Sequence, residues 1–290
     1  MCGKTATYNL KWSEVYDYAS ALTPPAALPP DPENRVNISP SRLRRKSEPD
    51  SMVWESLPVI YTHADGGTDS PAEAIWPFIP AYSEGRLPMN KQGKLISTAN
   101  ARLRHDGQPF APTFMGAWNS GFRVLVVVSW FYEFDSRVKP QVPYAVFPTD
   151  APFWMMAGLA RRTVLPDGSR HLTVAIITVD PNEVLKSVGH HRSPALLRSP
   201  EEAATWLHGG KDEALPLLRP HQDETMGVEA VPMGIKIPGN QGVELPEALP
   251  RSRSSRLTAG HAHGARTNFP PALPFSLGTR RRDPHHGLLS

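Results

Sequence analysis

Cysteine is almost absent from this sequence, since Cys2 is the only one among 290 residues. An intrachain disulfide is therefore impossible, as is typical of proteins from a reducing compartment. Long hydrophobic runs are absent as well, because no apolar stretch approaches the roughly 18 residues that cross a bilayer. The opening residues, MCGKTATYN, lack the apolar segment of a secretory signal. We therefore expect a cytoplasmic protein with no membrane partner.

An excess of basic charge is missing from most of the chain, although the whole sequence carries a net charge of +3. Seven arginines and one acid follow position 250, a local balance of +6, which leaves 24 basic and 27 acidic residues in 1–250, a balance of −3. The segment 251–290 is rich in Arg, Ser, Gly, His and Pro, a composition typical of disorder. We expect a folded domain over 1–250 and a basic, disordered tail over 251–290. The high overall basicity does not by itself predict a nucleic-acid-binding face on the domain.

Strand signals outnumber helix signals. The proline-rich residues 23–34 exclude a helix or a central strand there. The turn residues Asp167-Gly168 predict a hairpin between the last two of five β-branched or apolar runs. The predicted strands are Val53–Tyr61, Phe122–Phe134, Tyr144–Phe147, Phe153–Leu159 and His171–Val179.

Two helices have clear start signals. Ser13 is expected to cap a helix from Glu14 to about Leu22. Ser199 is expected to cap a second helix, with Pro200 in its first position, Glu202 completing a capping box and Gly209-Gly210 ending it. Strands and helices do not alternate regularly, so the fold class predicted is α+β.

Cys2 is notable for its position, directly after the initiator methionine. Removal of Met1 would leave an α-amine and a thiol on adjacent carbons, groups that ordinarily titrate near about pH 8 and about pH 8.5. Such a 1,2-aminothiol condenses with an aldehyde to a five-membered thiazolidine, which no internal cysteine can do. A terminal cysteine without a function is the alternative.

Four short segments combine reactive or polar residues with apolar surroundings: Cys2-Gly3-Lys4, Asn100-Ala101-Arg102, Trp130-Phe131-Tyr132-Glu133-Phe134 and His190-His191-Arg192-Ser193-Pro194. Each also fits a plain role, such as a solvated carboxylate at a strand end or two loop histidines. Together they supply a nucleophile, an amide, a carboxylate and an imidazole, which is what a covalent mechanism requires.

Seven segments stand out when the chain is taken in order over about residues 2–246. They are Met1-Cys2-Gly3, Asn37-Ile38-Ser39-Pro40, Trp76-Pro77-Phe78-Ile79-Pro80-Ala81-Tyr82, Asn100-Ala101-Arg102, Phe131-Tyr132-Glu133-Phe134, His190-His191-Arg192-Ser193-Pro194 and Asn240-Gln241-Gly242-Val243-Glu244-Leu245. In this order they resemble motifs of the SOS response-associated peptidase (SRAP) family, whose members include proteins that crosslink to abasic sites in single-stranded DNA.

The resemblance implies a fold and a mechanism. The fold would be mixed, largely antiparallel β-sheets curled into a barrel-like core with peripheral helices. The amine of processed Cys2 would attack the ring-opened aldehyde of an abasic deoxyribose, and its thiol would close a thiazolidine crosslink. His190 would help to open the sugar ring. Glu133 would transfer protons and assist crosslink reversal, and Asn100 would orient the sugar or the cysteine.

The same resemblance implies the binding residues and the partner, which is single-stranded DNA with abasic sites. Lys4, Arg102 and Arg192 are expected to bind DNA. Arginine suits a phosphate better than lysine does, because its guanidinium can contact two phosphate oxygens at once. Trp76 and Tyr82 would support or stack on bases, with core packing as the alternative for Trp76. We expect a monomer that needs no metal or organic cofactor and associates with the nucleoid when bound to DNA. Autoproteolytic removal of the residue before Cys2 would be a second activity.

The sequence also departs from the family pattern. Arg104 stands where the family has an acid, Lys4 stands where arginine is usual, and Ser193 replaces a methionine. Two other functions stay open. One is an N-terminal-nucleophile amidohydrolase or cysteine peptidase that uses Cys2 with His190. The other is a single-stranded-DNA binder whose reactive site has decayed.

Overall fold

The computed structural model describes residues 3–43, 52–62, 67–247 and 249. Long β-branched runs form the strands at the centre of the protein. Five strands close into a ring in which each pairs with two neighbours, and only the β6–β12 pair is parallel. Around the ring these are β5 (Ser56–Thr62), β6 (Asp69–Ile75), β12 (Arg170–Val179), β11 (Trp154–Val164) and β8 (Arg123–Val128). Two short strands, β7 (Asn100–Arg102) and β13 (Ser193–Pro194), add to the C-terminal half of β12.

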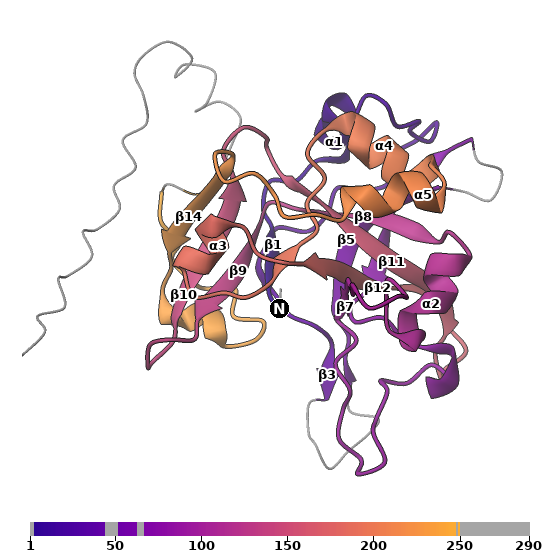
Figure 1. Cartoon of the computed structure of the whole chain (residues 1–290), viewed down its shortest axis with the longest axis horizontal. Helices are drawn as coiled ribbons and strands as arrows, with labels where there is room; N and C mark the ends of the chain where they lie inside the picture. The colour runs from indigo at the N-terminus through magenta and orange to yellow at the C-terminus, as the bar shows by residue number, and fades with distance from the viewer. Residues whose placement is uncertain (1–2, 44–51, 63–66, 248, 250–290) are drawn as a thin grey trace, which may run out of the picture. The chain divides into compact units, whose positions relative to one another are not determined.

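A second, antiparallel sheet stands beside the ring in Figure 1. Its order is β14 (Met226–Ala230), β10 (Val142–Pro148), β9 (Trp130–Asp135), β1 (Thr5–Thr7) and β2 (Arg35–Ile38). A separate pair joins β3 (Arg42–Leu43) to β4 (Met52–Val53). The predicted α+β class with largely antiparallel, barrel-like sheets is confirmed.

The predicted strand Phe122–Phe134 is two strands in two different sheets. β8 ends at Val128 in the ring, and β9 begins at Trp130 in the second sheet. Ser129, between them, donates its backbone N–H to the Ala6 carbonyl oxygen at 2.9 Å. The hydrophobic run gives no sign of this division, because both strands are buried along almost their whole length. The division carries Glu133 out of the ring and onto the second sheet.

Short helices lie around the sheets (Figure 1). They are α1 (Trp12–Tyr18), α2 (Pro112–Asn119), α3 (Glu183–Ser187), α4 (Pro200–His208) and α5 (Lys211–Ala214), with 3-10 turns η1 (Ala81–Ser83), η2 (Leu215–Leu217) and η3 (Met233–Lys236).

One of the two predicted helices is confirmed, and the other has different bounds. The α4 prediction is confirmed, since Ser199 Oγ accepts from the Glu202 N–H at 3.3 Å, although the Glu202 carboxylate accepts from the Arg198 N–H instead of closing the box. The α1 boundaries were wrong: Lys11 precedes the first helical residue, and the helix ends at Tyr18. Trp12 is buried, and this burial holds the first turn two residues earlier than the serine signal suggested.

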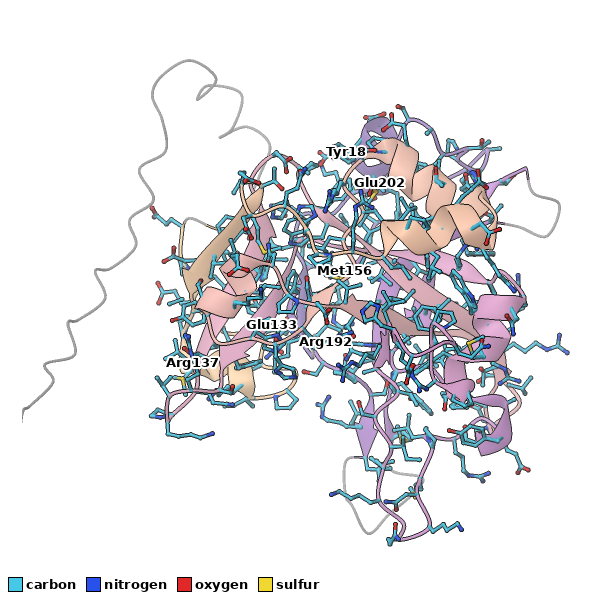
Figure 2. The ribbon with its side chains drawn as sticks, in the orientation of Figure 1. Tyr18, Glu133, Arg137, Met156, Arg192 and Glu202 are labelled. Carbon is cyan, nitrogen blue, oxygen red and sulfur yellow. The ribbon has the colours of Figure 1, made fainter. Side chains whose placement is uncertain are left out.

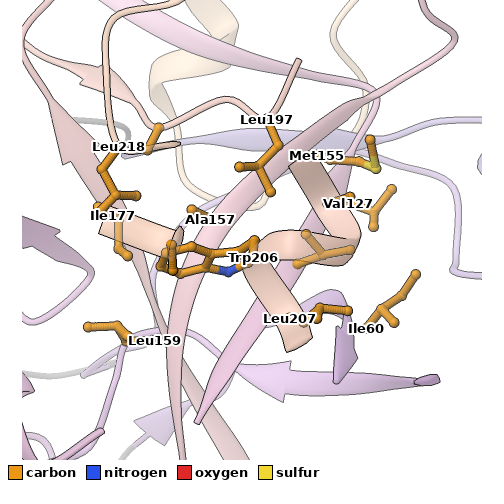
Figure 3. Packing of buried hydrophobic residues seen from close by; sticks show 14 of the residues in the cluster. Ile60, Val127, Met155, Ala157, Leu159, Ile177, Leu197, Trp206, Leu207 and Leu218 are labelled. Atoms are coloured by element: carbon orange, nitrogen blue, oxygen red, sulfur yellow. The ribbon is translucent and has the colours of Figure 1, made fainter. Parts of the chain in front are cut away.

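Alternate residues of the strands face two different cores. One set, contributed by all five ring strands, fills the interior of the ring and includes Val126, Met156 and Val174. The other set faces outward and is covered by α1, α2 and α4. Figure 3 shows the indole of Trp206 lying across this outer core, with its Nε1–H donating to the Val124 carbonyl oxygen at 2.9 Å.

No helix in the described ranges has the length and apolar character needed to cross a membrane. The predicted tail 251–290 lies outside the described residues, so the domain boundary at 250 stays a prediction.

Candidate active site

Glu133 and His190 meet where the second sheet approaches the ring (Figure 2 labels Glu133). The Glu133 side chain has no exposed surface, the His190 side chain is 9% exposed, and Oε2 of the former lies 2.7 Å from Nε2 of the latter. The other imidazole nitrogen, Nδ1, lies 2.7 Å from the Arg192 carbonyl oxygen. A carbonyl oxygen only accepts, so Nδ1 carries a hydrogen. A hydrogen bond between Nε2 and the carboxylate therefore requires one further proton, which either group can carry.

The loop that carries His190 is fixed by the segment before it. Asn182 caps α3 by accepting from the Leu185 N–H at 3.1 Å, and the His190 N–H donates to the Leu185 carbonyl oxygen at 2.9 Å. Gly189 has a φ of +72°, and a β-carbon there would lie 2.2 Å from Asp135 Oδ1. Only glycine fits this approach of the loop to the end of β9.

An ion pair holds the same loop against the second sheet. Arg137 pairs with Asp135 at 2.8 Å, and its guanidinium also donates to the Ser187 carbonyl oxygen at 2.7 Å. Hydrogen bonding to Arg137 holds the pKa of Asp135 below its usual range. Sequence reasoning missed both residues, because a charged pair at a strand end has no distinctive pattern.

Strand β12 brings two of the predicted segments together. On one side β7 places Asn100 opposite Ile176 and Arg102 opposite Thr178. On the other side β13 places Ser193 opposite Val179. Asn100 and Arg102 thus share one end of the ring with the histidine loop. Ser193 is buried, and its Oγ donates to the Pro194 carbonyl oxygen at 2.8 Å.

Arg192 is buried, in contrast to the exposed Arg102. Its guanidinium donates to Asp180 Oδ1 at 2.9 Å and to the Thr178 carbonyl oxygen. Burial lowers the pKa of Arg192, and the nearby positive charge of Arg102 lowers it further. These contacts tie the histidine loop to the end of β12, a positioning role that the family motif alone does not reveal.

The N-terminal segment runs alongside β9. In this antiparallel pair Thr5 lies opposite Phe131, and the Tyr132 N–H donates to the Lys4 carbonyl oxygen at 2.9 Å. Continued by two residues, this register brings Gly3 opposite Glu133. Cys2, the predicted nucleophile, lies outside the described residues.

Lys4 is almost fully buried among polar groups. Its Nζ donates to Asn37 Oδ1 at 3.1 Å and to Ser39 Oγ at 2.7 Å. Asn37 in turn donates through Nδ2 to the carbonyl oxygens of Ile235 and Ile237 at 3.1 and 2.7 Å. Burial, aided by the charge of Arg42, lowers the pKa of Lys4 to about 8. The Asn37-Ile38-Ser39-Pro40 segment thus provides the acceptors that hold this cation.

The two aromatic residues predicted to contact bases differ in exposure. Trp76 is fully buried in the ring interior, where its Nε1–H donates to the Ala99 carbonyl oxygen at 2.9 Å. It presents no free face to a base, so its place is that of a core residue. Tyr82, on η1, is 62% exposed and borders a groove of about 710 Å³ with Trp54, Arg86 and Met89.

No cluster of three or more potential metal-ligating side chains occurs among the residues that the structure describes.

Comparisons with known proteins agree on one family. A family model described as SOS response associated peptidase (SRAP) matches residues 1–237. The abasic site processing protein YoqW of Bacillus subtilis is 25% identical over 219 residues, covering 74% of this chain and 92% of its own. The abasic site processing protein HMCES of Gallus gallus is 29% identical over 196 residues, covering 58% of this chain and 56% of its own.

Two solved structures from Bordetella bronchiseptica share the fold. One has a TM-score of 0.60 at 19% identity, covering 80% of this chain and 100% of its own. The other, a phage-related protein, has a TM-score of 0.57 at 20% identity, covering 84% of this chain and 100% of its own.

Proposed function

Because this chain belongs to the SOS response-associated peptidase family, we propose that it processes abasic sites in single-stranded DNA by forming a covalent thiazolidine crosslink through Cys2. Relatives named abasic site processing proteins support the substrate. The single observation that carries the chemistry is the buried 2.7 Å contact between Glu133 and His190, a distance over which a proton can pass between the two groups beside the N-terminal strand.

The first step is opening of the sugar. A proton leaves the C1′ hydroxyl, another reaches the ring oxygen O4′, and the C1′–O4′ bond breaks to leave an aldehyde. The Glu133–His190 pair can accept the first proton and supply the second, which is general acid–base catalysis by one coupled pair. Asn100, at the same end of the ring, is assigned to hydrogen bonding of the sugar or of Cys2.

The second step joins protein and DNA. After loss of Met1 the Cys2 amine adds to the aldehyde carbon, and one water leaves to give an imine. The thiol then adds to the imine carbon while its proton passes to the nitrogen, which closes the five-membered ring. The register of β1 on β9 supports this role, because Cys2 directly precedes Gly3, the residue brought opposite Glu133. Reversal of the crosslink would use the same two residues, Glu133 and His190, with each proton moving in the opposite direction.

DNA binding is assigned to exposed or partly accessible cations near this end of the ring. Arg102 is exposed and is the residue best placed for a phosphate. Lys4 is almost fully buried, so it adds positive charge without an assigned phosphate contact. Tyr82, in the groove beside the β11–β12 turn, offers an exposed ring on which a base can stack. Arg192 and Trp76 are assigned to positioning and packing, because both are buried.

The test uses the full chain and a single-stranded oligonucleotide with one abasic site. Intact mass first establishes whether Met1 has been removed. The processed protein should then give a band that survives a denaturing gel, with a mass increase equal to the DNA minus one water. Cys2→Ala should abolish it. Glu133→Gln should slow it by about 10²- to 10⁴-fold, the range typical of lost acid–base catalysis.

Glu201→Gln, at an exposed position on α4, is the matched control and should react at the wild-type rate. Absence of any band from processed wild-type protein would overturn the proposal. Turnover of amide substrates without DNA would favour the amidohydrolase alternative, and DNA binding that is independent of Cys2 and yields no crosslink would favour the decayed binder.

A further inference from the structure

Arg104 continues the line of polar side chains that begins at Asn100. Ala101 and Leu103 are buried, whereas Arg102 and Arg104 are exposed. The Leu103 N–H donates to the Thr178 carbonyl oxygen at 2.9 Å, so the segment stays extended along β12 beyond the end of β7. In an extended chain, side chains two residues apart lie on one side at about 6.6 Å. Both arginines therefore project from one side of this segment, at a separation comparable to that of successive phosphates in an extended strand.

The present partner of Arg104 is an exposed aspartate in its own loop. Nε and a terminal nitrogen of Arg104 donate to Asp106 at 2.9 and 2.5 Å, and the two side chains are 40% and 62% exposed. An ion pair between exposed side chains contributes little to stability because water competes for both partners. A phosphate offers the same two-oxygen geometry to the guanidinium fork. Exchange of Asp106 for a phosphate is therefore not costly.

Among the cations near Arg104, Arg192 and Arg102 differ in their partners. Arg192 is neutralised by Asp180 at 2.9 Å, and His105 also faces that aspartate at 3.7 Å. Arg102 has no ion-pair partner among the residues that the structure describes. An anionic strand that reaches Arg102 thus meets Arg104 as the next cation along the same side.

We propose that Arg104 binds a backbone phosphate of single-stranded DNA next to the one held by Arg102, and that Asp106 occupies its guanidinium until DNA displaces it. The inference rests on the proposed function for the presence of a DNA strand at Asn100, and it adds the direction in which that strand leaves the site, along β7 toward Arg104. Asp106 then acts as an internal competitor that limits affinity.

The experiment measures equilibrium binding of the full chain to a fluorescein-labelled single-stranded oligonucleotide without an abasic site, over a range of salt concentrations. Each phosphate contact to a single strand contributes about 0.7 to the slope of log K against log salt. Arg104→Gln should lower the magnitude of this slope by about 0.7. The ratio of wild-type to variant affinity should therefore be about fivefold larger at 0.1 M salt than at 1 M salt. Arg170→Gln, an exposed arginine at the opposite end of β12, is the control and should change neither quantity.

Asp106→Asn should tighten binding, and the gain should vanish when Arg104→Gln is also present, because the two residues act through one contact. Equal binding by wild type and Arg104→Gln, or a gain from Asp106→Asn that persists in the double variant, would overturn the inference. The assay contains no aldehyde, so failure of the crosslinking proposal would appear in the gel experiment alone. Loss of the Arg104 effect would appear here alone.

Discussion

Replacing Lys4 with methionine should change how the stability of the protein depends on pH. Burial lowers the pKa of Lys4 from 10.5 to about 8 in the folded state, whereas the unfolded chain retains the ordinary value. Each pKa unit corresponds to about 1.4 kcal/mol, so keeping Lys4 charged in the folded protein costs about 3 kcal/mol. Below pH 8 both states carry the charge, and the folded state bears this cost in full.

Between pH 8 and 10.5 the folded state loses the proton first, so the unfolded state binds more protons and stability rises with pH. The free energy of unfolding of the wild type should therefore rise relative to that of Lys4→Met by about 2 to 3 kcal/mol between pH 7 and 10. The offset at pH 7 also contains the loss of the donor to Asn37 and Ser39, so the change with pH is the informative quantity.

Urea titrations at several pH values measure this difference, since the midpoint and slope give the unfolding free energy at each pH. Lys11→Met, at an exposed position, is the control and should follow the wild type throughout. A difference between wild type and Lys4→Met that stays constant from pH 7 to 10 would refute the assignment of Lys4 as a buried cation with a lowered pKa.

The remaining predictions concern packing, capping and the N-terminal strand. Gly158→Ala would place its methyl carbon 2.9 to 3.3 Å from three valine side chains inside the ring, and should lower the urea-derived unfolding free energy by about 1–3 kcal/mol. Ser199→Ala removes the cap of α4 and should cost about 1 kcal/mol in the same assay. Insertion of one glycine between Gly3 and Lys4 moves the Cys2 amine by about one strand residue, 3.3 Å, and should reduce crosslinking at least about 10²-fold. The same insertion after the exposed Gly93 should leave crosslinking unchanged.

Local signals in the sequence were sufficient for several elements. The Asp167-Gly168 turn lies between β11 and β12 as predicted, and Ser199 caps α4. β6 was missed because its sequence, DSPAEAI, contains a proline and three polar residues, and ladders to β5 and β12 override that low propensity. Closure of the ring was likewise not predictable in detail, because it depends on β11 pairing with both β8 and β12.

For the candidate site, too, the sequence indicated the residue types but not which residues lie close together in the fold. The residue types at Asn100, Glu133 and His190 were visible in the sequence, and their order indicated the family. Their proximity was not visible, because Glu133 and His190 are 57 positions apart and belong to separate parts of the fold. Lys4 was assigned to DNA without its buried acceptors, Asn37 and Ser39, since a short polar motif does not reveal which side chain it will contact.

Ser129 explains how the fold assembles this site. At this residue the chain leaves the ring, and the Ser129 hydroxyl both accepts from the Tyr8 N–H at 2.8 Å and donates to the Tyr8 carbonyl oxygen at 3.0 Å. The N-terminal strand is thereby fastened at the point where β8 becomes β9, and the ladder onto β9 sets its register relative to Glu133. The backbone ladder onto β9, together with the side-chain contacts of Ser129 and Lys4, therefore holds the described N-terminal residues beside the strand that carries Glu133. The nucleophile proposed at Cys2 depends on such a framework, because a residue at a chain terminus has a neighbour on one side only and is otherwise poorly ordered.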